Sequence, residues 1–145
     1  MNYGRLLAAA IAGTVFDMAY GFVVYGMLLA NQFAAYPGVY RPAADASHMP
    51  VLAAGVFIGA CVAAYIYAKG YEGGSGAAEG LRFGMALGVF VGGYSTLVNW
   101  AVLNIGRTLA LSMAAVAVVE WTLIGLIIGL VYKPAASAGR RATGV

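Results

Sequence analysis

Residues 109–132 read LALSMAAVAVVEWTLIGLIIGLVY and contain a single charged residue, Glu120. At a helical rise of about 1.5 Å per residue, a stretch of this length can cross a hydrocarbon core about 30 Å thick. Three more apolar runs precede it, at 6–30, 51–68 and 83–105, and the second of these is the shortest. The sequence therefore predicts an all-α, polytopic membrane protein whose four transmembrane helices form an up-down bundle across residues 1–134.

The composition supports the same class. Of the 145 residues, 63% are hydrophobic and 9% are charged, whereas a soluble domain carries about a quarter charged residues. Too little of the chain lies outside the four runs to form a catalytic domain, so we expect no enzyme. The net charge of +3 is not gathered into a basic surface, and such a surface is what nucleic-acid binding requires.

The basic residues predict an orientation. With the N-terminus in the cytoplasm, six basic residues fall on the inner side and only Arg41 and Arg107 on the outer side, which is the bias seen in membrane proteins. The six are Arg5, Lys69, Arg82, Lys133, Arg140 and Arg141. We therefore expect a multi-pass protein of the bacterial inner membrane with both termini cytoplasmic and a short, flexible, basic tail at 135–145.

The N-terminal segment allows a second interpretation, because residues 1–13 also resemble a signal peptide. The apolar pattern resumes after Asp17 and continues to Ala30, which favours a retained transmembrane helix.

Helix boundaries are indicated by proline and glycine. All four prolines lie outside the apolar runs or at their first turn. Because proline inside a helix breaks a hydrogen bond and clashes with the preceding turn, their absence predicts unkinked helices. Residues 106–108 form a tight connection in which Thr108 is the expected N-cap, so the last two helices should pack as an antiparallel hairpin.

Glycine spacing is the strongest structural motif. A glycine recurs every four residues in the third run, and shorter versions occur in the second and fourth runs. The residues are Gly80, Gly84, Gly88 and Gly92, then Gly55 and Gly59, and Gly125 and Gly129. Small residues at this spacing let two helix backbones approach closely in a membrane. The pattern predicts glycine-mediated packing, either within one chain or in a homodimer.

Two acidic residues lie inside the apolar runs. A carboxylate near the bilayer centre costs at least about 2.5 kcal/mol, so it is seldom retained without a structural or functional reason. Asp17 is 12 positions beyond Arg5 and Glu120 is 13 positions before Lys133. Each acid therefore lies roughly 18 to 20 Å from the inner boundary, and the two share one layer of the membrane.

Other polar residues fall near that layer. Tyr94, Thr96 and Asn99 in the third run could join the two acids in a cluster. Tyr20 and Tyr25, beyond Asp17 in the first run, could line a polar path from the outer face or simply pack.

No basic side chain is available at this depth to neutralise the acids, so a shared proton or a bound cation is the natural solution. Neutral acids acting as hydrogen-bond donors between helices are the structural alternative.

Cysteine and histidine limit the chemistry. The only cysteine, Cys61, lies in an apolar run and is expected to be a packing residue. The only histidine, His48, lies in the first loop, so one chain cannot assemble a bis-histidine haem or a histidine-rich metal site. We expect no metal site and no cofactor.

The four-run layout, the Tyr25-Gly26 pair and the glycine-striped third run resemble small bacterial inner-membrane proteins of uncharacterised function. The size and the acid in the first run are also similar to small multidrug transporters. That resemblance implies a proton-linked site at a membrane-embedded acid. Those transporters use a glutamate, whereas this chain has Asp17, a second acid at Glu120 and a longer first loop.

Two function classes follow from these features. The first is a small transporter or channel that moves a proton, a cation or a small solute by means of Asp17 and Glu120. The second is a non-catalytic accessory or assembly subunit that lies against a larger membrane complex through its glycine-lined faces. The lipid bilayer is the expected surrounding in either case, with a homodimer or a larger complex as the assembly.

Overall fold

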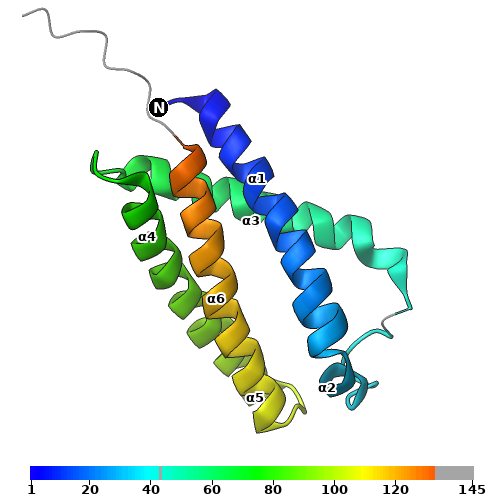
Figure 1. Ribbon diagram of the computed structural model, residues 1–145. Helices are drawn as coiled ribbons and strands as arrows, with labels where there is room; N and C mark the ends of the chain where they lie inside the picture. The colour runs from blue at the N-terminus through cyan, green and yellow to red at the C-terminus, as the bar shows by residue number, and fades with distance from the viewer. Residues whose placement is uncertain (43, 133–145) are drawn as a thin grey trace, which may run out of the picture.

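The computed structural model describes residues 1–42 and 44–132, and these residues form helices and connecting turns without any strand. The helices, shown in Figure 1, are α1 (Tyr3–Val23), α2 (Ala30–Ala34), α3 (Met49–Gly70), α4 (Gly76–Phe90), α5 (Leu97–Val102) and α6 (Arg107–Val131). A 3-10 turn, Ala46–His48, precedes α3. The predicted tail at 135–145 lies outside the described residues.

Four helical stretches are long and apolar enough to cross a membrane: Tyr3–Leu28, Ala46–Gly70, Gly76–Val102 and Arg107–Val131. They suggest a multi-pass membrane protein. The third stretch begins at Gly76, earlier than the expected start at 83, because Glu79 and Arg82 interrupt the apolar pattern without interrupting the helix.

Among the described α-helices, only α1 begins at a capping side chain. Asn2 accepts a hydrogen bond from the backbone N–H of Arg5 at 3.1 Å and so caps α1. The prediction of Thr108 as the cap of α6 was wrong, because the helix already begins at Arg107 and Gly106 occupies the N-cap position.

Two of the long helices contain a π-helical segment. Val24–Leu28 follows α1, and its wider turn is closed by a hydrogen bond from the Leu29 N–H to the Val24 carbonyl at 2.8 Å. Val91–Thr96 connects α4 to α5. The lack of interior proline predicted unkinked helices, but π turns disturb a helix without proline and often occur at functional sites.

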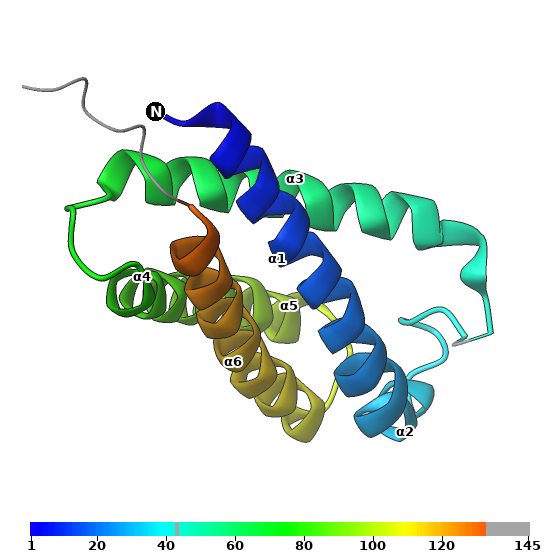
Figure 2. The ribbon, with the colours of Figure 1, turned by 45° about the horizontal axis from the view of Figure 1, so that its top comes forward.

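The helices run in alternating directions, with the N-terminus of α1 and the C-terminus of α6 at the same end (Figure 1). α6 packs along α4 and α1, and α1 also packs along α3. α3 and α4 are consecutive in the chain, yet within the described residues few of their backbone positions lie close together. Figure 2 shows their ribbons apart, with α1 and α6 crossing in front. Side chains connect them at one end, where the Tyr67 ring packs against Phe83 with centroids 5.6 Å apart and the Tyr67 hydroxyl donates to the Gly76 carbonyl oxygen at 3.4 Å.

Buried apolar residues form two clusters at opposite ends of the bundle. At the end of the bundle where α1 begins, the cluster consists of Ala9, Ala10, Ala60, Ala63, Ala64, Tyr67, Ile124, Ile128 and Tyr132. At the other end, Ile105, Leu109 and Ala110 pack with Phe33, Tyr36, Tyr40 and Met113. The stretch of α6 between the two clusters carries Glu120.

Glycines of α4 lie directly against the backbone of α6. A Cβ atom added to Gly84 would lie 2.8 Å from the Thr122 carbonyl oxygen and 2.9 Å from the Gly125 Cα. A Cβ atom added to Gly88 would lie 2.8 Å from the Val118 carbonyl oxygen. Real Cβ atoms do not approach backbone this closely, so these positions have no room for a side chain.

The other glycines of the motif differ in their surroundings. Added Cβ atoms at Gly80, Gly92 and Gly129 would also meet backbone of the facing helix at 3.0 Å or less. At Gly59 the nearest atom would be on the Trp121 ring, 3.7 Å away, and at Gly55 nothing lies within 4 Å. The close approach therefore belongs to α4 and α6, and not to α3.

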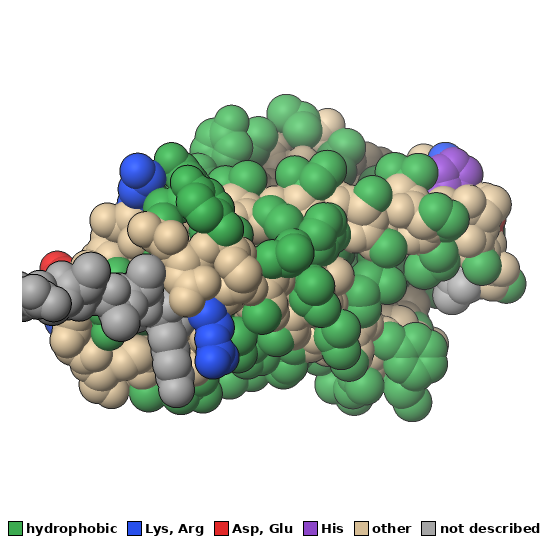
Figure 3. All heavy atoms as spheres, turned by 90° about the horizontal axis from the view of Figure 1, so that it is seen from above, with side chains coloured by type: hydrophobic (Ala, Val, Ile, Leu, Met, Phe, Trp, Pro, Cys, Tyr) green, Lys and Arg blue, Asp and Glu red, His purple; other side chains and the backbone are tan. Residues whose placement is uncertain are grey.

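Hydrophobic side chains cover the middle of the face seen in Figure 3, and charged side chains and histidine gather toward its two ends. Large apolar residues are exposed on each long helix, for example Val15, Val62, Val89 and Leu130. Such a surface is unusual for a soluble protein and is typical of helices that face lipid.

Candidate functional site

Small residues bring the middle of α1 against the middle of α6. Gly13 lies one turn before Asp17, and a Cβ atom added there would lie 3.6 Å from Ile124 Cγ2. On α6, Ala117 and Ile124 are buried on the face that also carries Glu120. The two acids therefore lie on the facing sides of neighbouring helices.

The carboxyl groups of Asp17 and Glu120 approach one another across the contact between α1 and α6. Carboxylates only accept hydrogen bonds, so a direct hydrogen bond between two carboxyl groups requires a proton on one of them. Glu120 is 6% exposed, whereas Asp17 is half-buried. The pair is thus a buried acid joined to a more accessible one.

Tyrosines of the first long apolar stretch, Tyr3–Leu28, complete the site. The Tyr25 hydroxyl donates to Glu120 Oε2 at 2.9 Å, and the Tyr20 hydroxyl donates to the Val116 carbonyl oxygen at 2.9 Å. Their rings also pack edge to face, with centroids 6.4 Å apart. Tyr25 lies within the π-helical segment Val24–Leu28, so the irregular turn presents the hydroxyl that holds Glu120.

No positive charge is paired with the acids in the part of the chain that the structure describes. Its two ion pairs join Arg41 to Asp45 at 3.4 Å and Arg82 to Glu72 at 3.7 Å, and both lie at exposed positions. Within the described residues, the pair on α1 and α6 therefore receives a hydrogen bond from Tyr25 and has no cationic partner.

The three polar residues expected from the third run are placed differently. Tyr94 is 66% exposed and stacks on Phe90, with ring centroids 5.6 Å apart. Thr96 is buried and Asn99 is half-buried. Among the described residues, no hydrogen bond joins any of the three to Asp17 or Glu120. The structure thus brings the two acids together and leaves these three outside their hydrogen-bond network.

Tyr25 and Tyr20 are site residues that the depth count did not select. Their signal in the sequence was weak, because tyrosines in a membrane helix usually anchor at its ends or pack. A π turn cannot be read from residue spacing, and the direction of Tyr25 depends on it.

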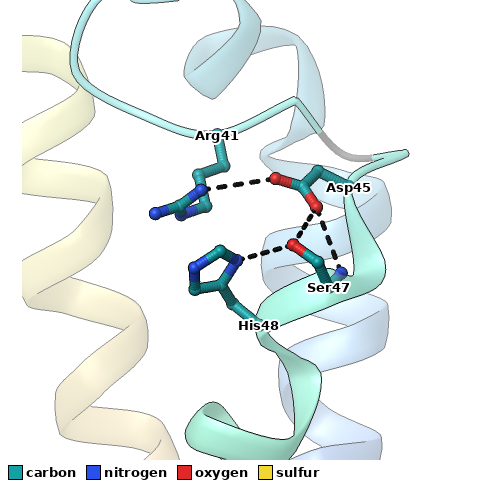
Figure 4. A network of polar contacts seen from close by, with 4 residues as sticks. All are labelled: Arg41, Asp45, Ser47 and His48. Atoms are coloured by element: carbon teal, nitrogen blue, oxygen red, sulfur yellow. Dashed lines mark hydrogen bonds and ion pairs between the residues drawn. The ribbon is translucent and has the colours of Figure 1, made fainter.

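The first loop holds a separate polar network near His48 (Figure 4). The Ser47 hydroxyl contacts Asp45 and lies 2.7 Å from His48 Nδ1. Hydrogen bonds from the Ser47 side chain and backbone hold the pKa of the Asp45 carboxyl below its usual range. The network is exposed, and the described residues contain no group of three or more His, Cys, Asp or Glu side chains that could hold a metal ion.

Replacing Tyr25 with phenylalanine removes one hydrogen bond to Glu120 and little volume. We expect the free energy of unfolding to fall by about 1 kcal/mol, because side-chain hydrogen bonds in membrane bundles contribute on that order. Equilibrium unfolding in mixed detergent micelles measures the change. Tyr94→Phe is the matched control and should leave stability unchanged, since the Tyr94 ring is exposed. Equal stability of both variants would contradict the assigned hydrogen bond.

In comparisons with known proteins, no family model, no curated protein and no solved structure matches the chain.

Proposed function

We propose that this chain is a small proton- or cation-linked membrane transporter or channel and that Asp17 and Glu120 form its proton- or cation-binding site. The observation that carries the proposal is a facing acid pair that has no cationic partner among the described residues and receives a tyrosine hydroxyl on its buried member. A pair of this kind can hold one shared proton, because two neighbouring carboxyl groups do not readily ionise together. Intramembrane acids at a helix interface commonly mark proton and ion paths.

The proposal includes insertion of the four long helices into a bacterial inner membrane with both termini cytoplasmic. The apolar surface and the distribution of basic residues support it. The tight α4–α6 contact fits the same setting, because small residues promote helix association in lipid. We therefore also propose that the glycines of α4 and α6 mediate packing within one chain.

An accessory subunit of a larger membrane complex is the second candidate, and the separation of the α3 and α4 backbones favours it. Consecutive helices of a self-sufficient bundle usually pack together, whereas α3 packs mainly on α1. The free side of α3 would then receive a helix of another protein. An enzyme is not part of either proposal.

Reconstitution tests the first candidate. The purified protein is inserted into liposomes that contain a pH-sensitive dye, and a proton gradient is imposed with and without Na⁺ or K⁺. We expect the gradient to collapse faster than in protein-free liposomes, and we expect a lipophilic carbodiimide, which modifies protonated buried carboxyls, to block the effect.

Rates equal to those of protein-free liposomes under all of these ionic conditions would contradict the transporter. Purification in mild detergent separates the second candidate, because an accessory subunit should leave the membrane with stoichiometric partners.

A further inference from the structure

The segment from Leu29 to Tyr40 folds back across the end of the bundle; we call it the strap. Leu29 is buried and forms the corner after the first transmembrane stretch, and α2 begins at the next residue. A turn closed by a hydrogen bond from the Val39 N–H to the Tyr36 carbonyl follows. In Figure 1, α2 lies below the lower end of α1, at the end of the bundle where α6 begins.

Three aromatic side chains attach the strap to the start of α6. Phe33, Tyr36 and Tyr40 pack against the buried cluster that contains Ile105 and Leu109. The other strap residues from Ala30 onward are polar, small or exposed, and none is charged. The strap is therefore held at a few points and not along its whole length.

Two polar contacts reinforce this attachment. The Tyr36 hydroxyl accepts a hydrogen bond from the Gly106 N–H at 2.9 Å, and the Tyr40 hydroxyl donates to Met113 Sδ at 3.7 Å. Burial, with a smaller contribution from Tyr36, raises the pKa of the Tyr40 hydroxyl, so it stays protonated as a donor.

The strap connects directly to the acid pair. The Phe33 ring packs edge to face between Tyr40 and Tyr25, with centroid distances of 4.8 Å and 6.3 Å. Tyr25 in turn holds Glu120. Along α6, Met113 is seven positions before Glu120, which is about 10 Å of helix. The strap thus lies at the end of the α1–α6 interface that contains the acids.

We propose that the strap is the lid that controls access from this end of the bundle to the Asp17–Glu120 pair. The lid proposal depends on the proposed function only for the purpose of the strap's movement, which would be to let protons or cations reach the pair. Few attachment points place the strap among the elements that open most easily. When the lid opens, the Phe33 ring moves away from Tyr25, which then loses a packing partner. Because Tyr25 donates a hydrogen bond to Glu120, opening of the lid would also loosen Glu120.

Access to a buried thiol tests the lid without any transport measurement. In a Cys61→Ala background, Ala117→Cys places a thiol on the buried face of α6 between Met113 and Glu120. The protein is reconstituted, and a charged, membrane-impermeant thiosulfonate is added on the side that carries the strap. Mass spectrometry follows the rate of modification.

Lid variants should accelerate this labelling. Tyr36→Phe removes one hydrogen bond, and we expect an increase of about fivefold. Phe33→Ala removes a packed ring, and we expect at least about a tenfold increase. Tyr3→Phe is the matched control and should not change the rate, because Tyr3 is 72% exposed at the opposite end of α1.

Equal labelling rates in the parent, Tyr36→Phe and Phe33→Ala proteins would overturn the lid, even if the wild-type protein transports protons. Faster labelling in both variants would support the lid, even if no transport is found, and the proposed function would then fail alone. Tyr36→Phe is an isosteric change, so a result is obtained even if Phe33→Ala does not fold.

Discussion

Gly84→Leu is expected to break the contact between α4 and α6 and to lower the free energy of unfolding by about 3 kcal/mol or more. A side chain at this position would meet the Thr122 carbonyl oxygen and the Gly125 Cα within 3 Å. Both atoms belong to a helix backbone, so they cannot rotate away as a side-chain tip could. Overpacking of this kind costs roughly 1 to 3 kcal/mol even where side chains can adjust, and here separation of the helices is the only relief.

Equilibrium unfolding in mixed micelles measures this loss, with Gly55→Leu as the matched control. Both glycines lie inside long helices, but a Cβ atom at Gly55 has nothing within 4 Å. We expect Gly55→Leu to be neutral or slightly stabilising, because leucine is the better helix former. If the two variants unfold at the same detergent fraction, the backbones of α4 and α6 are not in contact.

Asp17→Asn and Glu120→Gln are each expected to reduce proton flux by at least about 100-fold, the lower end of what a positioned proton-transfer group contributes. Each change removes the ability of one member to ionise and keeps its shape. Because the two acids lie close together and are proposed to act as one unit, each single variant should lose about as much activity as the double variant. Groups that act as a unit show this lack of additivity.

Flux is measured in the dye-loaded liposomes with equal amounts of folded protein. Glu72→Gln is the control. The Glu72 side chain is 77% exposed and lies in the connection between α3 and α4, outside the acid pair. It should keep the wild-type rate. Losses that multiply in the double variant would indicate two independent acids, and unchanged flux in both single variants would remove the carboxylate mechanism.

Several features of the fold could be predicted from the hydropathy of the chain and the lengths of its connections. The four long helices follow from hydropathy, and the alternating directions follow from short connections such as the one at Gly106. The start of the third span was predicted too late, because Arg82 was taken as its boundary although the helix begins at Gly76. Charges near a membrane surface belong to a helix as readily as apolar residues do.

The candidate site was predicted in depth but not in direction. Counting residues gave Asp17 and Glu120 a common layer, and the structure turns their helices so that the two carboxyls meet. The same count placed Tyr94 nearby, yet its ring points outward and is 66% exposed. Position along a helix axis follows from chain length, whereas the direction around the axis depends on which helix packs beside it.

By itself, the sequence determined the helical class, the apolar surface and the depth of the two acids, because these depend on composition and on the rise per residue. The tertiary structure decided which helices touch, that Tyr25 reaches Glu120, and that the strap lies over α6. These features depend on side-chain packing between segments far apart in the chain and on one π turn, Val24–Leu28. Residue spacing within a single helix carries no information about either.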